Sequence, residues 1–112
     1  MSKIEPRLEE EIRRMEQAGQ TDREIPVILE LTSRAPAGQP EVVDFSDLQR
    51  QVRAQQQGVV RRLGDLGVKR EIRQMTLSNS VETRLTAAQI RQVAGDEEVK
   101  RIILNRAEQV TA

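Results

Sequence analysis

Residues 80–104 constrain the fold of this chain more than any other segment, because three patterns follow one another closely. Apolar and polar residues alternate over residues 80–85, which predicts a strand buried on one face. Thr86, with Gln89 three positions later, forms a capping box, which is a typical helix start. After a short break, the apolar run VKRIIL at residues 99–104 predicts another strand. A strand–helix–strand unit is therefore expected here.

Three further elements are predicted upstream of this unit. A β-branched run over residues 25–32 predicts a mostly buried strand, and weak alternation over residues 68–75 predicts a strand that forms a hairpin with residues 80–85. Residues 45–66 predict the longest helix, with the pair Gln55–Gln56 on its solvated side. The apolar stripe expected on that helix consists of Leu48, Val52, Val59, Val60 and Leu63.

The predicted order is strand, helix, strand, strand, helix, strand. This order predicts an α+β chain with the ferredoxin-like split βαβ (βαββαβ) fold, in which two helices cover one face of an antiparallel sheet. The other face would be left open and would carry side chains such as Arg70, Glu82 and Arg84. A sheet that binds RNA would need aromatic residues there, and the chain has one Phe and no Trp or Tyr.

An extra helix is predicted before this unit, over residues 4–17. Residues 1–24 are therefore expected to form an amphipathic helix and a linker, and residues 25–112 the main domain. The favoured interpretation is that the helix packs on its own domain. The alternative is a contact with a partner or a second copy, which would make the chain an assembly module without inhibitory activity. The residues of the apolar stripe are Ile4, Leu8, Ile12 and Met15.

The composition excludes several classes of function. The 18 basic and 18 acidic residues of this 112-residue chain cancel, which argues against a nucleic-acid or anionic-membrane binder. Without cysteine the chain can form neither a disulfide nor a zinc–thiolate site, and without histidine it lacks the commonest general base. No signal-peptide pattern and no membrane-spanning apolar run occur in the sequence. A cytoplasmic location is expected, with secretion left open.

Two runs of carboxylates are the strongest candidates for chemistry. Residues 9–11 and 96–98 are consecutive acidic residues on a helix surface and at a helix end, so their side chains do not converge in a cleft. They also lack the alternating spacing of a calcium-binding loop. No catalytic residue, cofactor or metal ligand is therefore expected, and the chain is not expected to be an enzyme.

Four stretches together resemble the inhibitor-type prodomains of subtilases, the subtilisin propeptide family. Residues 79–81 correspond to the family's short Asn-Gly-Phe-like strand start, and residues 27–31 to its opening strand. Residues 85–90 are similar to its Leu-Thr-x-x-Gln-Val/Ile helix start, and residues 93–99 to its Leu-x-x-x-Pro-x-Val break. The resemblance covers residues 25–112 and leaves out the first helix.

The resemblance implies a partner and a mode of binding. Such domains bind a subtilisin-like serine protease with the open sheet face against two surface helices of the enzyme, and place their C-terminal tail in its cleft as a product-like strand. Here Ala112 would occupy the first specificity pocket, Gln109 the fourth, and Asn105 would cap a helix of the enzyme. The sequence departs from the family in having Asn105 and Arg106 where acidic residues are common, and in the polar Gln109. The implied binding residues are Asn105, Glu108, Gln109, Val110, Thr111 and Ala112.

Overall fold

The computed structural model describes residues 3–32, 45–68, 72–75 and 78–106, and of residues 45–48 the backbone only. These residues form three helices and a four-stranded sheet, so the predicted α+β class is confirmed. The elements in chain order are α1 (Pro6–Gln17), β1 (Glu24–Leu31), α2 (Phe45–Asp65), β2 (Arg73–Met75), β3 (Ser80–Thr86), α3 (Ala87–Val93) and β4 (Val99–Leu104).

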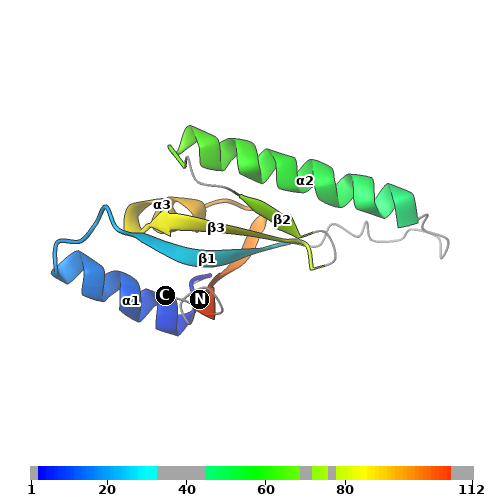
Figure 1. The fold of residues 1–112 in the computed structure, drawn as a ribbon. Coiled ribbons are helices and arrows are strands. Elements are labelled where there is room, and N and C mark those ends of the chain that lie inside the picture. Colours follow the sequence, from blue (N-terminus) through cyan, green and yellow to red (C-terminus); the bar gives the residue numbers. More distant parts are fainter. Residues whose placement is uncertain (1–2, 33–44, 69–71, 76–77, 107–112) are drawn as a thin grey trace.

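The sheet has the strand order β2-β3-β1-β4, and every neighbouring pair is antiparallel. The longest pairing joins β1 to β3, from Glu24 opposite Thr86 to Glu30 opposite Ser80. On its other side β1 pairs with β4, with Ile28 opposite Ile103. In the view of Figure 1, α2 lies at the top next to β2, and α1 lies at the bottom.

The core lies on one face of this sheet. Along β1, buried residues alternate with partly exposed ones, as expected for a strand with a single buried face. The sequence predicted a mostly buried strand here, and the structure buries every second side chain. Side chains from all three helices join those of the strands in one aliphatic cluster. Its fully buried large apolar members are Leu8, Ile12, Val27, Leu29, Val59, Leu63, Val81, Leu85, Ile90, Val99 and Ile102.

The predicted capping box starts α3. The Thr86 hydroxyl accepts a hydrogen bond from Gln89 N at 3.3 Å, and Gln89 Oε1 accepts one from Thr86 N at 2.9 Å. Gln89 Nε2 also donates to the carbonyl oxygen of Leu66, just after α2, at 3.2 Å. The box therefore joins the ends of two helices as well as starting one of them.

The first helix starts later than the sequence predicted. It was expected from Ile4, but α1 begins at Pro6, whose fixed φ and missing N–H suit the first turn of a helix. Ile4 instead forms a parallel bridge with Ile102 of β4. Ile102 N donates to Lys3 O at 2.9 Å, and Glu5 N donates to Ile102 O at 3.0 Å. Residues 3–5 thus pair with the outer edge of β4, which would otherwise be open to another strand.

The apolar stripe of α1 packs within its own chain. Leu8 and Ile12 are fully buried, and Ile4 and Met15 are each 6% exposed. All four belong to the same cluster as the strand side chains, so the predicted segments 1–24 and 25–112 share one core. This packing matches the favoured interpretation of the helix.

One expectation for the middle of the chain was wrong and another holds in part. Gln55 and Gln56 were placed on the solvated side of the long helix, but both are buried against the strands. The strand predicted over residues 68–75 pairs with β3 as the expected hairpin, but it comprises only Arg73–Met75 among the described residues. Of the predicted α2 stripe, Val59 and Leu63 are buried, Val52 and Val60 are partly exposed, and the Leu48 side chain lies outside the description.

Candidate functional site

The face of the sheet opposite the core is the first candidate site. Ile28 and Ile103 lie opposite each other on it, and both are partly exposed. Pro26 and Arg84 form the neighbouring cross-strand pair between β1 and β3. Because alternate residues of a strand point to opposite faces, these side chains lie away from the core. We call this surface the open sheet face.

Ion pairs border the apolar pair on the open sheet face. Arg101 forms a two-point contact with Glu30, its cross-strand partner, with Nη2–Oε1 at 2.8 Å and Nε–Oε2 at 3.0 Å. This contact raises the pKa of Arg101 above its usual value. Arg73 and Glu82 form a longer pair of 3.9 Å between β2 and β3.

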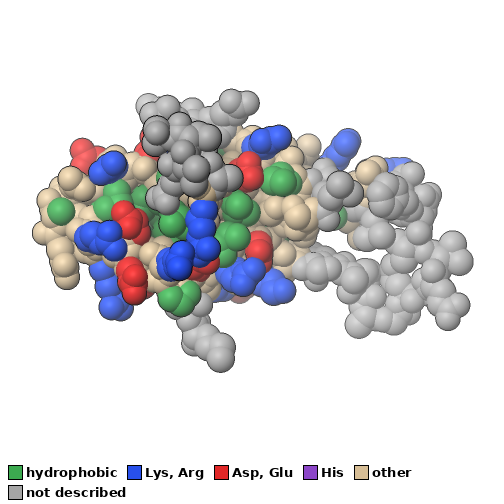
Figure 2. Space-filling model, turned by 60° about the horizontal axis from the view of Figure 1, so that its bottom comes forward, with side chains coloured by type: hydrophobic (Ala, Val, Ile, Leu, Met, Phe, Trp, Pro, Cys, Tyr) green, Lys and Arg blue, Asp and Glu red, His purple; other side chains and the backbone are tan. Residues whose placement is uncertain are grey.

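Two of the three residues that were expected on the open face belong to the described part of the chain. Glu82 and Arg84 project from β3 opposite the core, as expected, and Arg70 lies outside the described residues. On the molecular face shown in Figure 2, acidic and basic side chains are interspersed among apolar ones and are not separated by charge.

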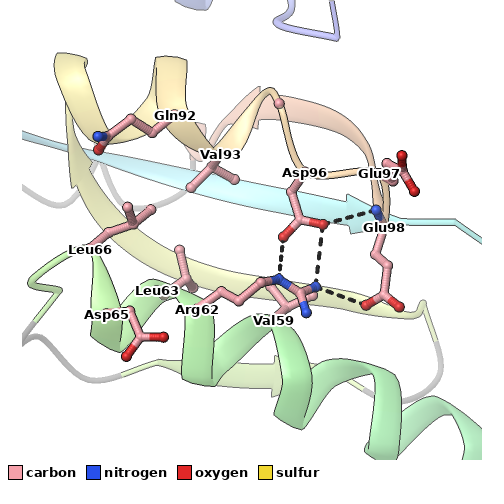
Figure 3. Close-up of a pocket in the computed structure, with 11 residues that line it drawn as sticks. Val59, Arg62, Leu63, Asp65, Leu66, Gln92, Val93, Asp96, Glu97 and Glu98 are labelled. Atoms are coloured by element: carbon pink, nitrogen blue, oxygen red, sulfur yellow. Dashed lines mark hydrogen bonds and ion pairs between the residues drawn. The ribbon is translucent and has the colours of Figure 1, made fainter.

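A groove of about 620 Å³ between α2 and the end of α3 is the second candidate. Figure 3 shows Arg62 of α2 pointing toward Asp96 and Glu98. Arg62 Nε donates to Asp96 Oδ2 at 2.6 Å, and Arg62 Nη2 donates to Glu98 Oε2 at 2.9 Å. The two carboxylates raise the pKa of Arg62, chiefly through the hydrogen bond to Asp96.

The same ion pairs give this groove a structural role. Asp96 Oδ1 accepts a hydrogen bond from Glu98 N at 3.0 Å, and the carbonyl oxygen of Asp96 accepts one from Lys3 Nζ at 2.8 Å. The turn before β4 is therefore held simultaneously by α2 and by the N-terminal segment. Arg62, Asp96 and Glu98 already satisfy one another, so the groove is a weaker candidate for binding than the open sheet face.

A polar cluster lies between α2 and the strands. Gln55 Nε2 donates to the carbonyl oxygen of Thr32 at 2.9 Å, and Gln55 Oε1 accepts from Asn79 Nδ2 at 3.0 Å. Gln56 Nε2 donates to the carbonyl oxygen of Met75 at 3.0 Å, while Gln56 Oε1 is buried and has no hydrogen-bond partner among the described residues. In the sequence, the only sign of this cluster is that two glutamines interrupt the apolar stripe of the helix. These glutamines were expected to face solvent.

A third set of charges joins α1 to α3. Arg91 Nη2 contacts Glu16 Oε1 at 2.8 Å, and Arg91 Nη1 contacts Glu9 Oε1 at 3.3 Å. The hydrogen bond from Arg91 is the main reason that the pKa of Glu16 is lowered. Sequence reasoning did not find this contact, because its partners lie 75 and 82 positions apart.

The binding residues implied by the resemblance are mostly untested. Glu108, Gln109, Val110, Thr111 and Ala112 lie outside the described residues. Asn105 is described and is only 8% exposed, with its N–H donating to the carbonyl oxygen of Pro26 at 3.0 Å. In this arrangement the Asn105 side chain lies within its own fold. Its predicted role as a cap for a partner helix would need a rearrangement.

The carboxylate runs are placed apart from one another. Glu9 and Glu11 contact arginines of α1, and Asp96 and Glu98 contact Arg62 of α2. Within the described ranges, no group of three or more acidic side chains is arranged to hold a metal ion. No described helix is both long and apolar enough to cross a membrane.

No protein-family model, no curated protein and no solved structure matches this chain. Function therefore has to be inferred from the residues themselves.

Proposed function

We propose that this chain is a non-catalytic binding domain that docks on a subtilisin-like serine protease through the open sheet face. The observation that carries the proposal is the cross-strand pair Ile28–Ile103, which is partly exposed and bordered by ion pairs. An apolar centre with a polar rim is the usual anatomy of a protein-binding surface.

We also propose that the fold is the ferredoxin-like split βαβ unit. In support, each sheet neighbour is antiparallel, so β1 and β2 run in the same direction with β3 between them. By the same reasoning, β3 and β4 run in the same direction with β1 between them. Two interleaved strand–helix–strand connections of this kind define the fold.

The proposed mechanism is occupation of the protease cleft. The open sheet face anchors the domain, and the tail from Glu108 to Ala112 lies in the cleft as a substrate-like strand. Val110 and Thr111 favour an extended backbone, which suits main-chain pairing with an enzyme strand. As in the family that the sequence resembles, the domain would act as an inhibitor and as a folding chaperone. The support for this step is the resemblance alone.

The competing proposal, an assembly module that uses the apolar stripe of α1, has less support. Leu8 and Ile12 are fully buried in the core of their own chain. For these side chains to contact a partner, α1 would have to leave the core. The open sheet face can meet a partner without such a rearrangement.

A titration of a broad-specificity subtilisin tests the proposed function. Wild-type protein should inhibit it, and a version lacking residues 110–112 should not. Ile28→Glu should weaken inhibition by about tenfold or more, because a charge would be buried at the centre of the contact. Val60→Glu is the matched control, since Val60 is also apolar and partly exposed but lies on α2.

Folding of both variants is checked first by circular dichroism. If the wild-type protein does not inhibit, or if Ile28→Glu inhibits as well as Val60→Glu, the proposed docking surface is wrong.

A further inference from the structure

The segment of residues 3–17 binds the remainder of the chain as a ligand would. It contributes a short extended stretch that pairs with Ile102 of β4 through two backbone hydrogen bonds. It then contributes a helix whose residues Leu8, Ile12 and Met15 fill part of the core. The other side of this contact is formed by β4, α3 and the sheet. We call the two parts the N-terminal arm and the arm site.

Polar contacts specify how the arm docks. Glu5 Oε1 accepts a hydrogen bond from Leu104 N at 3.1 Å and so replaces a carbonyl of a neighbouring strand. Glu5 Oε2 lies 3.7 Å from Arg106 Nη2. Arg91 contacts Glu9 and Glu16 on α1. These contacts fix both the position of the arm along β4 and its orientation toward α3.

The connector between the arm and β1 does not fix where the arm docks. Every residue from Ala18 to Arg23 is exposed. The backbone hydrogen bonds described for the connector are local, as in Gln20 N to Met15 O at 2.9 Å and Arg23 N to Gln20 O at 3.3 Å. Gly19 lies at φ +71°, a conformation that glycine adopts without strain. The connector can therefore take another path without losing a buried side-chain contact.

The overall charge also favours contact between copies. With 18 basic and 18 acidic residues the chain has no net charge at neutral pH, so two copies do not repel each other as a whole. Each copy carries one arm and one arm site, and these fit each other because they are in contact within the single chain. When identical elements change places between two copies, the contacts between each element and its site are kept and only those of the connector change, which is a low-cost route to a dimer.

We propose that two copies of this chain exchange their N-terminal arms and form a reciprocal dimer. In this dimer Ile4 of one copy bridges Ile102 of the other, and Glu9 and Glu16 of one copy contact Arg91 of the other. The apolar stripe of α1 stays buried, so the dimer needs no exposed apolar patch. The inference stands apart from protease docking, which uses the open sheet face.

The arm contact offers a charge-reversal test on the full chain. One variant carries Arg91→Glu, and a second variant carries Glu16→Arg. In each variant alone, positions 16 and 91 carry like charges, while Glu9 is unchanged in both. When the two are mixed and exchange arms, position 16 of each arm meets a position 91 of opposite charge. Both side chains are about 41% exposed, so neither reversal threatens the core.

The mixture is unfolded in denaturant, refolded at high protein concentration, and analysed by native mass spectrometry with one variant labelled with ¹⁵N. The fraction of dimers that contain one copy of each variant should be larger than random pairing would give. The matched control replaces Glu16→Arg by Glu10→Arg, a reversal on the exposed side of the same helix. With this control the excess of mixed dimer should disappear.

Wild-type protein refolded in the same way should contain dimers in sedimentation equilibrium. If only monomers form in both experiments, arm exchange does not occur. If dimers form but the Glu10→Arg mixture pairs as strongly as the Glu16→Arg mixture, the copies associate through another surface, and the proposal is equally overturned.

Discussion

Ile4 and Ile102 are bridged in parallel at the outer edge of the sheet, although 98 positions separate them in the sequence. The two hydrogen bonds of the bridge, Ile102 N to Lys3 O and Glu5 N to Ile102 O, measure 2.9 and 3.0 Å. This contact closes the edge of β4 and sets the point from which α1 enters the core. The N-terminal helix is thereby part of the domain and not an appendage to it.

Leu8→Ala should destabilise the whole chain. Leu8 is fully buried in the shared core, and truncating a buried leucine typically costs about 2–5 kcal/mol. Chemical denaturation followed by circular dichroism should show one transition at a lower denaturant midpoint. Glu10→Ala, on the exposed side of α1, should leave the midpoint nearly unchanged. Two separate transitions, with only the first one shifted, would show that α1 folds apart from the sheet.

Gln55→Ala should lower the free energy of unfolding by about 1 kcal/mol, because it removes the hydrogen-bond partner of partly buried polar groups. Gln55 contacts both Thr32 and Asn79 between α2 and the strands. Gln57→Ala is the matched control, since it makes the same change on the exposed side of α2. Equal effects of the two substitutions in urea denaturation would mean that the Gln55 contacts contribute nothing.

Thr86→Ala should cost about 1 kcal/mol by removing the cap of α3. The hydroxyl of Thr86 accepts the hydrogen bond from Gln89 N, and the alanine variant leaves this N–H without its acceptor. Thr86→Ser keeps the hydroxyl and should retain most of the stability. Thermal unfolding of the two variants side by side measures the difference. If the serine variant is as unstable as the alanine variant, the lost stability does not come from the hydroxyl cap of α3 but from the place of Thr86 at the end of β3.

Acidification should remove the contribution of the Glu16–Arg91 contact. The pKa of Glu16 is lowered in the folded chain, mainly by the hydrogen bond from Arg91. A lowered pKa means that the stabilisation is fully present above the unfolded-state pKa of about 4.3 and is lost as the pH falls through the folded-state value. Wild-type protein should therefore exceed Glu16→Gln in stability at neutral pH and match it in acid.

The measurement for this prediction is the melting temperature of both proteins as a function of pH. Because the contact is exposed, high salt should reduce the difference at neutral pH. Glu10→Gln serves as the control with the same chemical change on the exposed side of the helix. A difference between wild type and Glu16→Gln that persists unchanged in acid would mean that the Glu16 charge is not its cause.

The elements that the sequence predicted well are those specified by neighbouring residues. The Thr86–Gln89 box lies within one turn of helix, and both of its hydrogen bonds form as expected. The alternation of β3 likewise needs only a buried and an exposed face, and Val81, Thr83 and Leu85 are all buried. Local patterns of this kind are independent of how distant segments meet.

The features that the sequence did not predict depend on distant contacts. Ile4 continues the helical spacing of α1, but its pairing with Ile102 is decided by the edge of β4. Gln55 is polar, and its burial depends on Thr32 and Asn79 being placed opposite it. For the candidate site, the sequence indicated an open face but not the pairing of Ile28 with Ile103.

The aliphatic core also determines which spectroscopic probe can follow this protein. Its described apolar members are isoleucine, leucine and valine, together with Met15 and Ala87. The chain contains neither tryptophan nor tyrosine, so tryptophan fluorescence has no native reporter. Every one of these core side chains ends in a methyl group. Selective ¹³C-methyl labelling would therefore give a magnetic-resonance signal from every described core position, including the contact between α1 and β4.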